Sequence, residues 1–466
     1  MKISNNISNI YFVGIGGIGM SALARYFNLN GYNVSGYDRT PTELTDKLKS
    51  EGINICFEDD TKNIPQNINA ENTLIVYTPA IPKDNKILSF FKENNFTMKK
   101  RAEVLGLIFN EKQGLAIAGT HGKTSISTIT AYLLYNAGES FSSFIGGISK
   151  NFNSNLILNK NSKYIVAEAD EFDRSFLHLF PSTTLISSVD ADHLDIYGEK
   201  DELKRNFELF ASQTAENGNI IIKYGINIET PDNANVFTYS LNNKNADFYA
   251  ENIHRESEKY VFDVVLPDNQ RIENVTIGIP GLINVENAIA GISICVTNGI
   301  APEKFVESLS DFAGVKRRFD YIIKSEDTVF IDDYAHHPEE LKATISSVKE
   351  LYPDKEITGI FQPHLYSRTR DFAEDFAKSL DLLDNIILLD IYPARELPIK
   401  GVSSKIIFDK MKNENKTLCS KNEITEHLKN TINNKTGNVI LTLGAGDINK
   451  EINKIKNFLL DEVVKN

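Results

Sequence analysis

Short apolar runs alternate with stretches of helical periodicity near the start of the chain. The runs lie at residues 9–13, 33–36 and 73–77, and a helical pattern covers 23–29. Strands that alternate with helices are typical of βαβ units, which build parallel sheets. The pattern therefore predicts a doubly wound α/β domain at this end of the chain.

The same alternation returns twice. A second cycle opens with an apolar run at 115–118 and a long helical pattern at 123–135, followed by runs at 164–167 and 184–189. Between about 219 and 279 short strands with Asn, Asp and Pro punctuation suggest an antiparallel elaboration. A third cycle has runs at 328–331, 356–361, 385–389 and 438–443. We expect three α/β domains, at 1–113, 114–320 and 321–466.

Composition narrows the classes of partner. The 466 residues carry a formal net charge of −13, which argues against an electrostatic grip on nucleic acid. Three scattered cysteines predict neither disulfides nor a metal cluster, and no window resembles a membrane span or a leader peptide. We expect a cytoplasmic protein, a monomer or weak homodimer, that acts on small molecules rather than on nucleic acid or membrane.

A glycine triplet follows the first predicted strand. Gly14, Gly16 and Gly19 satisfy G-x-G-x-x-G, and Asp38 lies at the end of the second strand. Glycines at these positions let the backbone approach a diphosphate at the helix N-terminus, and the acid can accept a ribose hydroxyl. A bare triplet is equally compatible with a tight turn, but strand, helix and acid together favour a nucleotide. A nicotinamide cofactor is the obvious first interpretation.

A second phosphate loop weakens that interpretation. GTHGKTS at 119–125 follows an apolar run and opens a helix, so it offers backbone N–H groups, the Lys123 ammonium and the Thr124 hydroxyl to a triphosphate and its metal. The strict P-loop has glycine where this chain has Ile117. That difference argues against an ordinary P-loop GTPase or kinase, not against phosphate binding.

Two further residues are candidates for Mg²⁺. Glu168 and His193 each follow an apolar run, so a parallel sheet brings them to the edge that carries Lys123. A carboxylate and a neutral imidazole can ligate Mg²⁺ beside nucleotide phosphates. Either residue alone would more often be a solvated side chain or a cap.

Taken together, the motifs resemble those of the Mur ligase family over essentially the whole chain. The segments that carry the resemblance are GIGGIGMSALA, GTHGKT, EADE, DADHLD, DDYAHHP, the QPH-Y-RTR segment and GAGDI. The combination is typical of the branch that adds L-alanine. The resemblance implies a Rossmann-like N-terminal domain for the UDP-sugar, a central P-loop ATPase-type domain with a mostly parallel sheet, and a C-terminal Rossmann-like domain for the amino acid.

The resemblance also implies an activity. ATP, with Mg²⁺, would phosphorylate the carboxylate of UDP-N-acetylmuramate, and the amine of L-alanine would displace the phosphate to form an amide. His336 would accept a proton or position the amino acid, and both roles remain open.

Roles for single residues follow by the same similarity. The resemblance assigns ATP to Gly119, Thr120, His121, Gly122, Lys123, Thr124, Ser125, Asn284, Asn287, Arg317, Arg318 and Asp333. It assigns the UDP-sugar to Gly14, Gly16, Gly17, Gly19, Asp38 and Thr78, and the amino acid to Tyr334, His336 and Arg368. Metal ligands would be Thr124, Glu168 and His193, and catalytic residues Lys123, His336 and Arg368.

Two residues depart from the family pattern, and other functions remain as alternatives. The family usually has His and Arg where this chain has Ile283 and Leu365. A ligase that adds a murein tripeptide to the same UDP-sugar is the closest alternative. An NAD-dependent oxidoreductase would leave GTHGKTS without a purpose, and a P-loop switch protein would leave the first nucleotide site unexplained.

Overall fold

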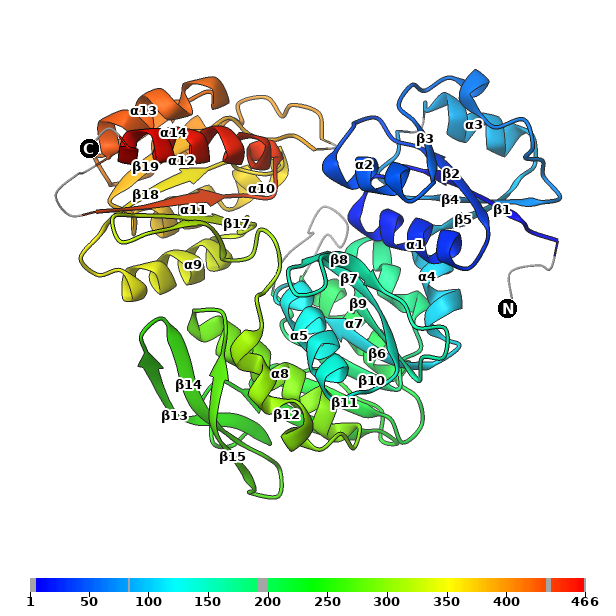
Figure 1. The fold of residues 1–466 in the computed structure, drawn as a ribbon, viewed down its shortest axis with the longest axis horizontal. Helices are drawn as coiled ribbons and strands as arrows, with labels where there is room; N and C mark the ends of the chain where they lie inside the picture. Colours follow the sequence, from blue (N-terminus) through cyan, green and yellow to red (C-terminus); the bar gives the residue numbers. More distant parts are fainter. Residues whose placement is uncertain (1–5, 83, 191–199, 395, 433–436, 465–466) are drawn as a thin grey trace. The chain divides into compact units, whose positions relative to one another are not determined.

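The structure is a computed structural model that describes residues 6–82, 84–190, 200–394, 396–432 and 437–464 (Figure 1). Within these ranges the strands form three sheets, which confirms the expected α/β class. The chain folds as two compact units. Unit 1 comprises Met1–Ile253, Phe262–Thr276 and Glu286–Phe312, and unit 2 comprises His254–Val261, Ile277–Val285 and Ala313–Asn466.

The first sheet has the order β3-β2-β1-β4-β5, and every neighbouring pair in it is parallel. Its strands are β1 (Asn9–Val13), β2 (Asn33–Tyr37), β3 (Asn54–Cys56), β4 (Thr73–Tyr77) and β5 (Thr97–Lys100). Its helices are α1 (Ile18–Leu29), α2 (Glu43–Ser50), η1 (Thr61–Asn63), α3 (Lys86–Glu93) and α4 (Arg101–Phe109). β1 is buried at every position, as a central parallel strand covered on both faces must be.

The second sheet has the order β15-β14-β13-β12-β11-β10-β6-β9-β7-β8. Its strands are β6 (Gln113–Ala118), β7 (Phe141–Ser149), β8 (Ser154–Ile157), β9 (Tyr164–Ala169), β10 (Thr183–Ile186), β11 (Asn219–Lys223), β12 (Asn235–Ser240), β13 (Phe248–Glu256), β14 (Lys259–Val265) and β15 (Arg271–Ile277). The associated helices are α5 (Lys123–Asn136), η2 (Phe172–His178), α7 (Lys200–Ser212), α8 (Leu282–Thr297), η3 (Pro302–Lys304) and η4 (Val306–Asp311).

One expectation for this region is wrong in part. We expected antiparallel strands from residue 219 onward, but β11 pairs in parallel with β10 and β12, and β12 in parallel with β13. β11 is NIIIK with three consecutive buried isoleucines. Such a continuous apolar run is typical of a strand covered on both faces, as in a parallel sheet.

The third sheet has the order β16-β17-β21-β18-β19-β20, with β16 antiparallel to β17 and the other pairs parallel. Its strands are β16 (Asp320–Lys324), β17 (Thr328–Asp333), β18 (Glu356–Phe361), β19 (Asn385–Leu389), β20 (Lys416–Cys419) and β21 (Asn438–Leu443). Its helices are α9 (Pro338–Leu351), α10 (Tyr366–Asp371), α11 (Ala373–Leu380), α12 (Lys405–Phe408), η5 (Lys421–Glu423), α13 (Ile424–Thr431), η6 (Asp447–Glu451) and α14 (Ile452–Val464).

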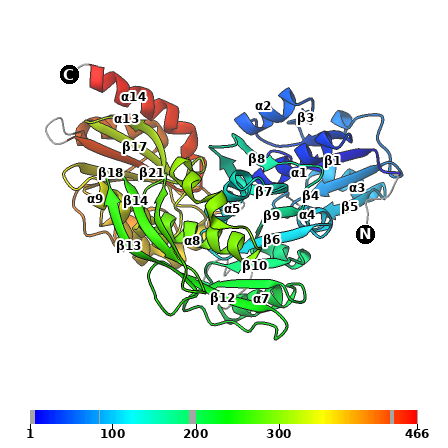
Figure 2. The same ribbon diagram turned by 60° about the horizontal axis from the view of Figure 1, so that its bottom comes forward.

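Unit 1 joins the first sheet to the second through α1. In Figures 1 and 2 this helix lies beside β7 and β8. The Tyr26 ring lies 5.8 Å from that of Phe144, and the Asn155 amide donates to the carbonyl oxygen of Ile18 and the hydroxyl of Ser21. The two sheets of unit 1 therefore share one hydrophobic core.

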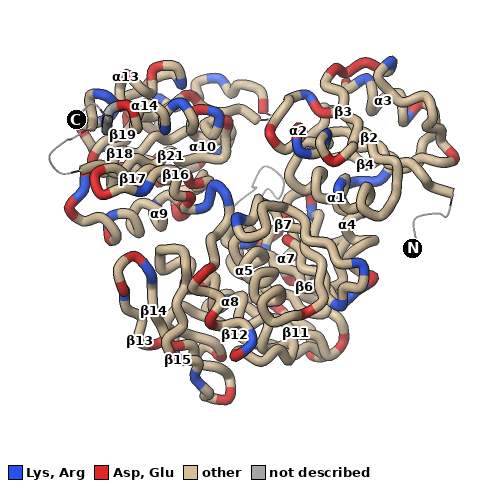
Figure 3. The backbone as a smooth tube through the Cα atoms, in the orientation of Figure 1, with Lys and Arg blue, Asp and Glu red and all other residues tan. Residues whose placement is uncertain are grey.

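Charge and hydropathy agree with this organisation. Acidic and basic residues are interspersed along the described chain in Figure 3, so the net charge of −13 is not confined to one element. Among the helices in the described ranges, none combines the length and apolar character that crossing a bilayer requires.

Candidate active site

The first glycine-rich loop lies between β1 and α1. Gly14 has φ 90°, a left-handed conformation that favours glycine, and α1 begins at Ile18 with Gly17 as its N-cap. The Gly16 N–H donates to Oδ2 of Asp38 at 2.7 Å. Asp38 thus fixes the loop directly, and its predicted contact with a ribose stays a prediction.

Thr78 closes the other side of this loop. Its Cγ2 would lie 3.3 Å from a Cβ placed on Gly14, so a side chain at Gly14 would have little room. The two predicted UDP-sugar segments, around Gly14 and around Thr78, therefore lie together at the carboxyl ends of β1 and β4. That is the edge at which doubly wound sheets bind ligands.

The second loop lies between β6 and α5. Gly119 has φ 133° and Gly122 has φ 85°, and α5 begins at Lys123. The loop is held by the residues that follow β10, because the Ser188 hydroxyl accepts from the His121 N–H at 2.8 Å and from the Thr120 hydroxyl at 2.9 Å. The side chain of Ser187 donates to the His121 carbonyl. Ser187 and Ser188 were not predicted from the sequence.

Lys123 is paired with a carboxylate that no motif identified as its partner. Its Nζ lies 2.8 Å from Oε2 of Glu171 and 2.5 Å from the Gly119 carbonyl oxygen. The Glu171 side chain is 1% exposed and that of Lys123 15%. Burial alone lowers the pKa of Lys123, but the charges of Glu171, Asp170 and Glu168 outweigh it and raise the pKa, so the ammonium stays protonated.

The predicted metal ligands are partly described. Glu168 lies near the end of β9 and packs so closely against Gly146 of β7 that a Cβ there would overlap its carboxylate. Thr124, in the first turn of α5, is 8% exposed. His193 lies outside the described residues. Among the described side chains, no group of three or more His, Cys, Asp or Glu is arranged to hold a metal.

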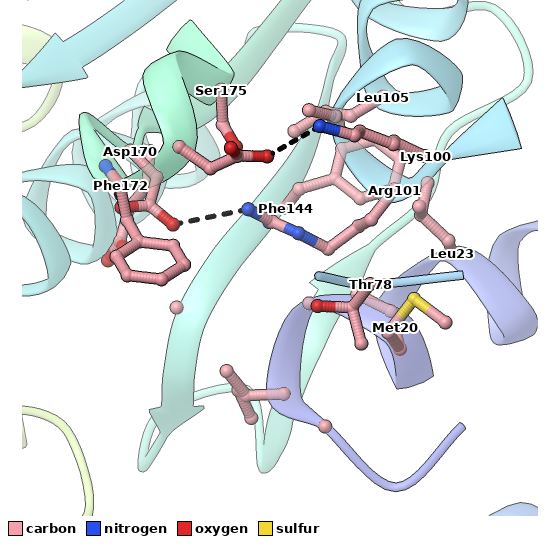
Figure 4. A pocket seen from close by; sticks show the side chains of 18 of the residues that line it. Met20, Leu23, Thr78, Lys100, Arg101, Leu105, Phe144, Asp170, Phe172 and Ser175 are labelled. Carbon is pink, nitrogen blue, oxygen red and sulfur yellow. Dashed lines mark hydrogen bonds and ion pairs between the residues drawn. The ribbon is translucent and has the colours of Figure 1, made fainter. Parts of the chain in front are cut away.

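A pocket of about 320 Å³ connects the first loop to the Glu168 end of β9. Its lining includes Gly17, Gly19 and Thr78 from the predicted UDP-sugar site and Glu168 from the predicted metal site. Figure 4 shows Thr78, Lys100, Arg101 and Asp170 around it. The structure thus brings together residues that the sequence assigned to two different ligands.

Lys100 and Arg101 are pocket residues that sequence reasoning missed. They lie where β5 passes into α4, and β5 pairs in parallel with β4, which leads to Thr78. The carboxyl-end rule for parallel strands would find them if β5 were recognised as a strand. However, β5 reads TMKK and lacks the apolar run that marks the other strands of this sheet.

α8 carries the two predicted adenine residues. Asn287 lies beside the second loop, since its Oδ1 would be 3.3 Å from a Cβ on Gly122. The Asn284 side chain donates to the Pro280 carbonyl oxygen at 2.6 Å. Next to Asn284 in the chain, Ile283 is 45% exposed where the family usually has His.

Unit 2 gathers the predicted amino-acid residues. The rings of Tyr334 and His336 lie 5.2 Å apart edge to face, and the His336 ring lies 6.0 Å from that of His364. Arg368, 6% exposed, brings its Nη1 within 3.5 Å of Nδ1 of His364. His364 in turn stacks on Tyr392, a residue that the sequence did not suggest.

The two adjacent arginines also lie in this cluster. The guanidinium carbons of Arg317 and Arg318 each lie 5.0 Å from the ring centre of Tyr334. Arg317 has φ 63° and donates to Asp332 at 3.3 Å and to the Gly444 carbonyl oxygen at 2.6 Å. Its backbone and side chain are therefore fixed within unit 2.

Asp333 is a buried carboxylate that holds the backbone. Its two oxygens accept from the N–H groups of Phe319 at 2.7 Å and Ala335 at 2.8 Å. Burial raises its pKa to about 6, against the opposing effects of Arg318 and these hydrogen bonds. The predicted contact with the ATP ribose stays a prediction.

Leu365 occupies the second position that departs from the family pattern. It is 3% exposed, has φ 70° and immediately precedes α10, whose first residues include Arg368. A leucine side chain has no polar group to offer a carboxylate, and this one is buried in unit 2. The amino-acid carboxylate would therefore depend on Arg368.

Comparisons with known proteins cover nearly the whole chain. Family models match in three parts: the Mur ligase family catalytic domain at residues 9–113, the Mur ligase middle domain at 117–295, and the Mur ligase glutamate ligase domain at 317–446. A UDP-N-acetylmuramate–L-alanine ligase from Christiangramia forsetii is 49% identical over 464 residues, which are 99% of this chain and 100% of the relative.

Two solved structures are similar in fold. The UDP-N-acetylmuramate–alanine ligase of Thermotoga maritima superposes with a TM-score of 0.82 at 26% identity, covering 98% of this chain and 100% of that one. A murein peptide ligase from Psychrobacter arcticus gives a TM-score of 0.72 at 22% identity, covering 97% and 98% of the two chains. The second similarity shows the fold alone.

Proposed function

The chain belongs to the Mur ligase family, and we propose that it is an ATP-dependent ligase that joins L-alanine to the carboxylate of UDP-N-acetylmuramate in peptidoglycan precursor synthesis. The observation that carries the proposal is the pocket that connects Gly17, Gly19 and Thr78 to Glu168. The charged ammonium of Lys123 lies near the Glu168 carboxylate. A nucleotide sugar held by the first loop can thus extend its acid toward a phosphate held by the second.

The reaction needs an activated acid, because a free carboxylate is a poor electrophile. The bond between the γ-phosphorus of ATP and its bridging oxygen breaks, a bond from that phosphorus to the substrate carboxylate forms, and ADP departs. The alanine nitrogen, after losing a proton, attacks the acyl carbon, and inorganic phosphate leaves. The products are the amide, ADP and phosphate.

Lys123 offsets the repulsion between the two anions of the first step. Its ammonium is kept charged and stands at the N-terminus of α5, where loop N–H groups also face a phosphate. Gly119, Thr120, His121 and Gly122 form the rest of this loop, and Thr124 and Ser125 follow Lys123 in the first turn of α5. Phosphate binding would replace Glu171 as the partner of Lys123.

The oxygen donors at this edge fit Mg²⁺. The Thr124 hydroxyl and the Glu168 carboxylate are oxygen donors of the kind that this ion takes, so these two residues would hold it beside the nucleotide phosphates. When bound, the ion would neutralise charge on the transferred phosphoryl group. His193 is retained as a proposed ligand from the family resemblance.

The remaining roles are proposals of the same kind. Asn284 and Asn287 approach the adenine, Asp333 the ribose, and Arg317 and Arg318 the phosphates. Tyr334 and His336 meet the alanine, and Arg368 binds its carboxylate. Gly14, Gly16, Gly17, Gly19, Asp38 and Thr78 surround the UDP-sugar.

The finer biological setting is also proposed. ATP and nucleotide sugars are cytoplasmic metabolites, so we place the activity in the cytoplasm and expect a monomer or weak homodimer. The domain limits at 1–113, 114–320 and 321–466 remain predictions.

The test is turnover with defined substrates. Purified protein is mixed with ATP, Mg²⁺, UDP-N-acetylmuramate and L-alanine, and phosphate release is followed together with mass spectrometry of the nucleotide sugar. We expect alanine-dependent phosphate release and a product heavier by one alanyl residue. Lys112 is an exposed lysine outside both glycine-rich loops, so Lys112→Ala serves as a control that should retain turnover.

The alternatives give different outcomes in this assay. Product with L-Ala-D-Glu-diaminopimelate and none with alanine would reassign the chain to murein-tripeptide addition. No phosphate release with any acceptor would contradict ligase activity altogether.

A further inference from the structure

Arg101 occupies a distinctive position in the pocket. It is the first residue of α4, and its side chain is 23% exposed. A Cβ placed on Gly19 would lie 2.8 Å from its Nη1, so the guanidinium packs directly against the first glycine-rich loop. At its other end, Nη2 lies 3.1 Å from Oδ2 of Asp170. Arg101 therefore spans the distance from the UDP-sugar loop to the Glu168 end of β9 (Figure 4).

The pocket is lined by more carboxylates than cations, so an anionic substrate group needs a cation such as Arg101 to face it. The charged residues that line it are Glu168, Asp170 and Asp173, opposed by Lys100 and Arg101. An acid that enters beside three carboxylates is repelled unless a cation faces it. Lys123, which pairs with the buried Glu171 here, is assigned to the phosphoryl group and Mg²⁺ to Glu168, so the cations of the pocket lining are the ones left to face the substrate acid.

Of the two lining cations, Arg101 is better suited than Lys100. Lys100 forms an ion pair with Asp173 at 2.8 Å, is 41% exposed, and its pKa is raised chiefly by that hydrogen bond. Arg101 is less exposed and presents a planar fork, the geometry that binds a carboxylate through two parallel hydrogen bonds. Its Nη2 already pairs with the Asp170 carboxylate, so a carboxylate fits against this end of the guanidinium.

The position of Arg101 also bears on which anionic part of the UDP-sugar it contacts, the diphosphate or the carboxylate. A diphosphate belongs at the N-terminus of α1, where loop N–H groups point. Arg101 packs against Gly19, the second residue of α1, and reaches Asp170, two residues beyond Glu168. The Nη1 end of the guanidinium thus lies against the first turn of α1, while the Nη2 end, at Asp170, faces the place of the reacting acid.

We propose that Arg101 is a substrate-binding residue that grips the lactyl carboxylate of the UDP-sugar and holds it for phosphorylation. The inference rests on the proposed function. Asp170 keeps the guanidinium in place until the substrate acid exchanges with it or shares the fork.

The test compares two nucleotide sugars that differ in that acid. UDP-N-acetylmuramate carries the lactyl carboxylate and UDP-N-acetylglucosamine lacks it. Their dissociation constants are measured by calorimetry for the unaltered chain, Arg101→Gln and Arg101→Lys. For Arg101→Gln we expect affinity for the muramate to fall about 10- to 100-fold, the range for a charge-assisted pair, while that for the glucosamine changes less than about 2-fold.

Arg101→Lys guards against a folding failure of the glutamine variant. It keeps a cation opposite Asp170 but loses the fork, so the ratio of the two affinities should fall by several-fold. The matched control is Arg25→Gln. Arg25 contacts Glu51 at 2.8 Å and Ser154 at 2.7 Å in the same unit without lining the pocket, so this variant should leave the ratio unchanged.

The outcomes separate this inference from the proposed function. If the ratio of the two affinities stays constant in the Arg101 variants, Arg101 is a structural or diphosphate contact. That result would overturn the inference and leave the proposed function standing. If the unaltered chain does not prefer the muramate, the proposed function fails and the inference falls with it.

Discussion

At the scale of single residues, the pair of Lys123 and Glu171 links stability to chemistry. The ammonium lies 2.8 Å from a carboxylate that is 1% exposed, so each charge depends on the other in a region largely closed to water. Removing one member of a buried pair leaves an unpaired charge, which costs about 3 kcal/mol or more. The lysine therefore contributes to the fold in addition to its proposed contact with phosphate.

A pair of substitutions separates these two contributions. Lys123→Met should lower the free energy of unfolding by about 3 kcal/mol and turnover by at least about 10³-fold, since both the ion pair and the phosphate contact are lost. Adding Glu171→Gln should restore much of the stability but none of the turnover. Calorimetric melting and phosphate release measure the two effects.

Lys112→Met is the control for loss of an exposed lysine and should change neither quantity. Turnover of Lys123→Met above a tenth of the original would show that Lys123 does not stabilise the transferred phosphoryl group. A double variant as unstable as the single one would show that the charge of Glu171 is not what the single substitution exposes.

At the scale of elements, the close approach of α8 to α5 positions the second loop. α5 carries Lys123 at its first residue, and Gly291 of α8 faces Ile129 of α5 so closely that a Cβ would lie 2.7 Å from Cγ2 of Ile129. Glycine at this position allows the two helices to pack in contact. A larger residue must push one helix away from the other.

We expect Gly291→Ala to destabilise the protein by about 1–3 kcal/mol and to reduce kcat/KM for ATP, because displacement of α5 moves Lys123. Thermal melting and initial rates at varied ATP measure these effects. In a double-mutant cycle, Ile129→Ala removes the opposing methyl, so the combined cost should be smaller than the sum of the single costs. Additive costs would mean that the contact is relieved elsewhere.

At the scale of the whole molecule, the three sheets are distributed over two compact units. The first sheet and most of the second share one core because α1 packs against β7 and β8. All the residues that line the pocket belong to unit 1, whereas the cluster of Tyr334, His336 and Arg368 belongs to unit 2. Measurements on single segments of the chain can therefore test which unit binds each substrate.

Hydrogen exchange tests that assignment. Saturating UDP should slow exchange in the segments around Gly14–Gly19 and Thr78, and ATP should slow it around Gly119–Ser125, because ligands stabilise the regions that bind them. Peptides from β17 and β21 provide an internal reference in the presence of UDP. Equal protection of those strands by UDP would contradict a uridine site confined to unit 1.

The succession of strands and helices and the place of both glycine-rich loops follow from the amino-acid sequence alone. Apolar runs mark buried strands, and the glycines at 14, 119 and 122 have the left-handed φ values that their loops require, so these features depend on neighbours in the chain. The combination of motifs also identified the family. The α/β class and the ligase activity could therefore be predicted from the sequence.

Which side chains meet depends instead on how the elements pack in three dimensions. Packing paired Lys123 with Glu171, placed Ser188 under the second loop, made β11 parallel to β12, and brought Arg101 of α4 between Gly19 and Asp170. Each of these contacts joins residues of different elements. Their partners are set by the packing of α1, α4 and the sheets, which local spacing does not encode.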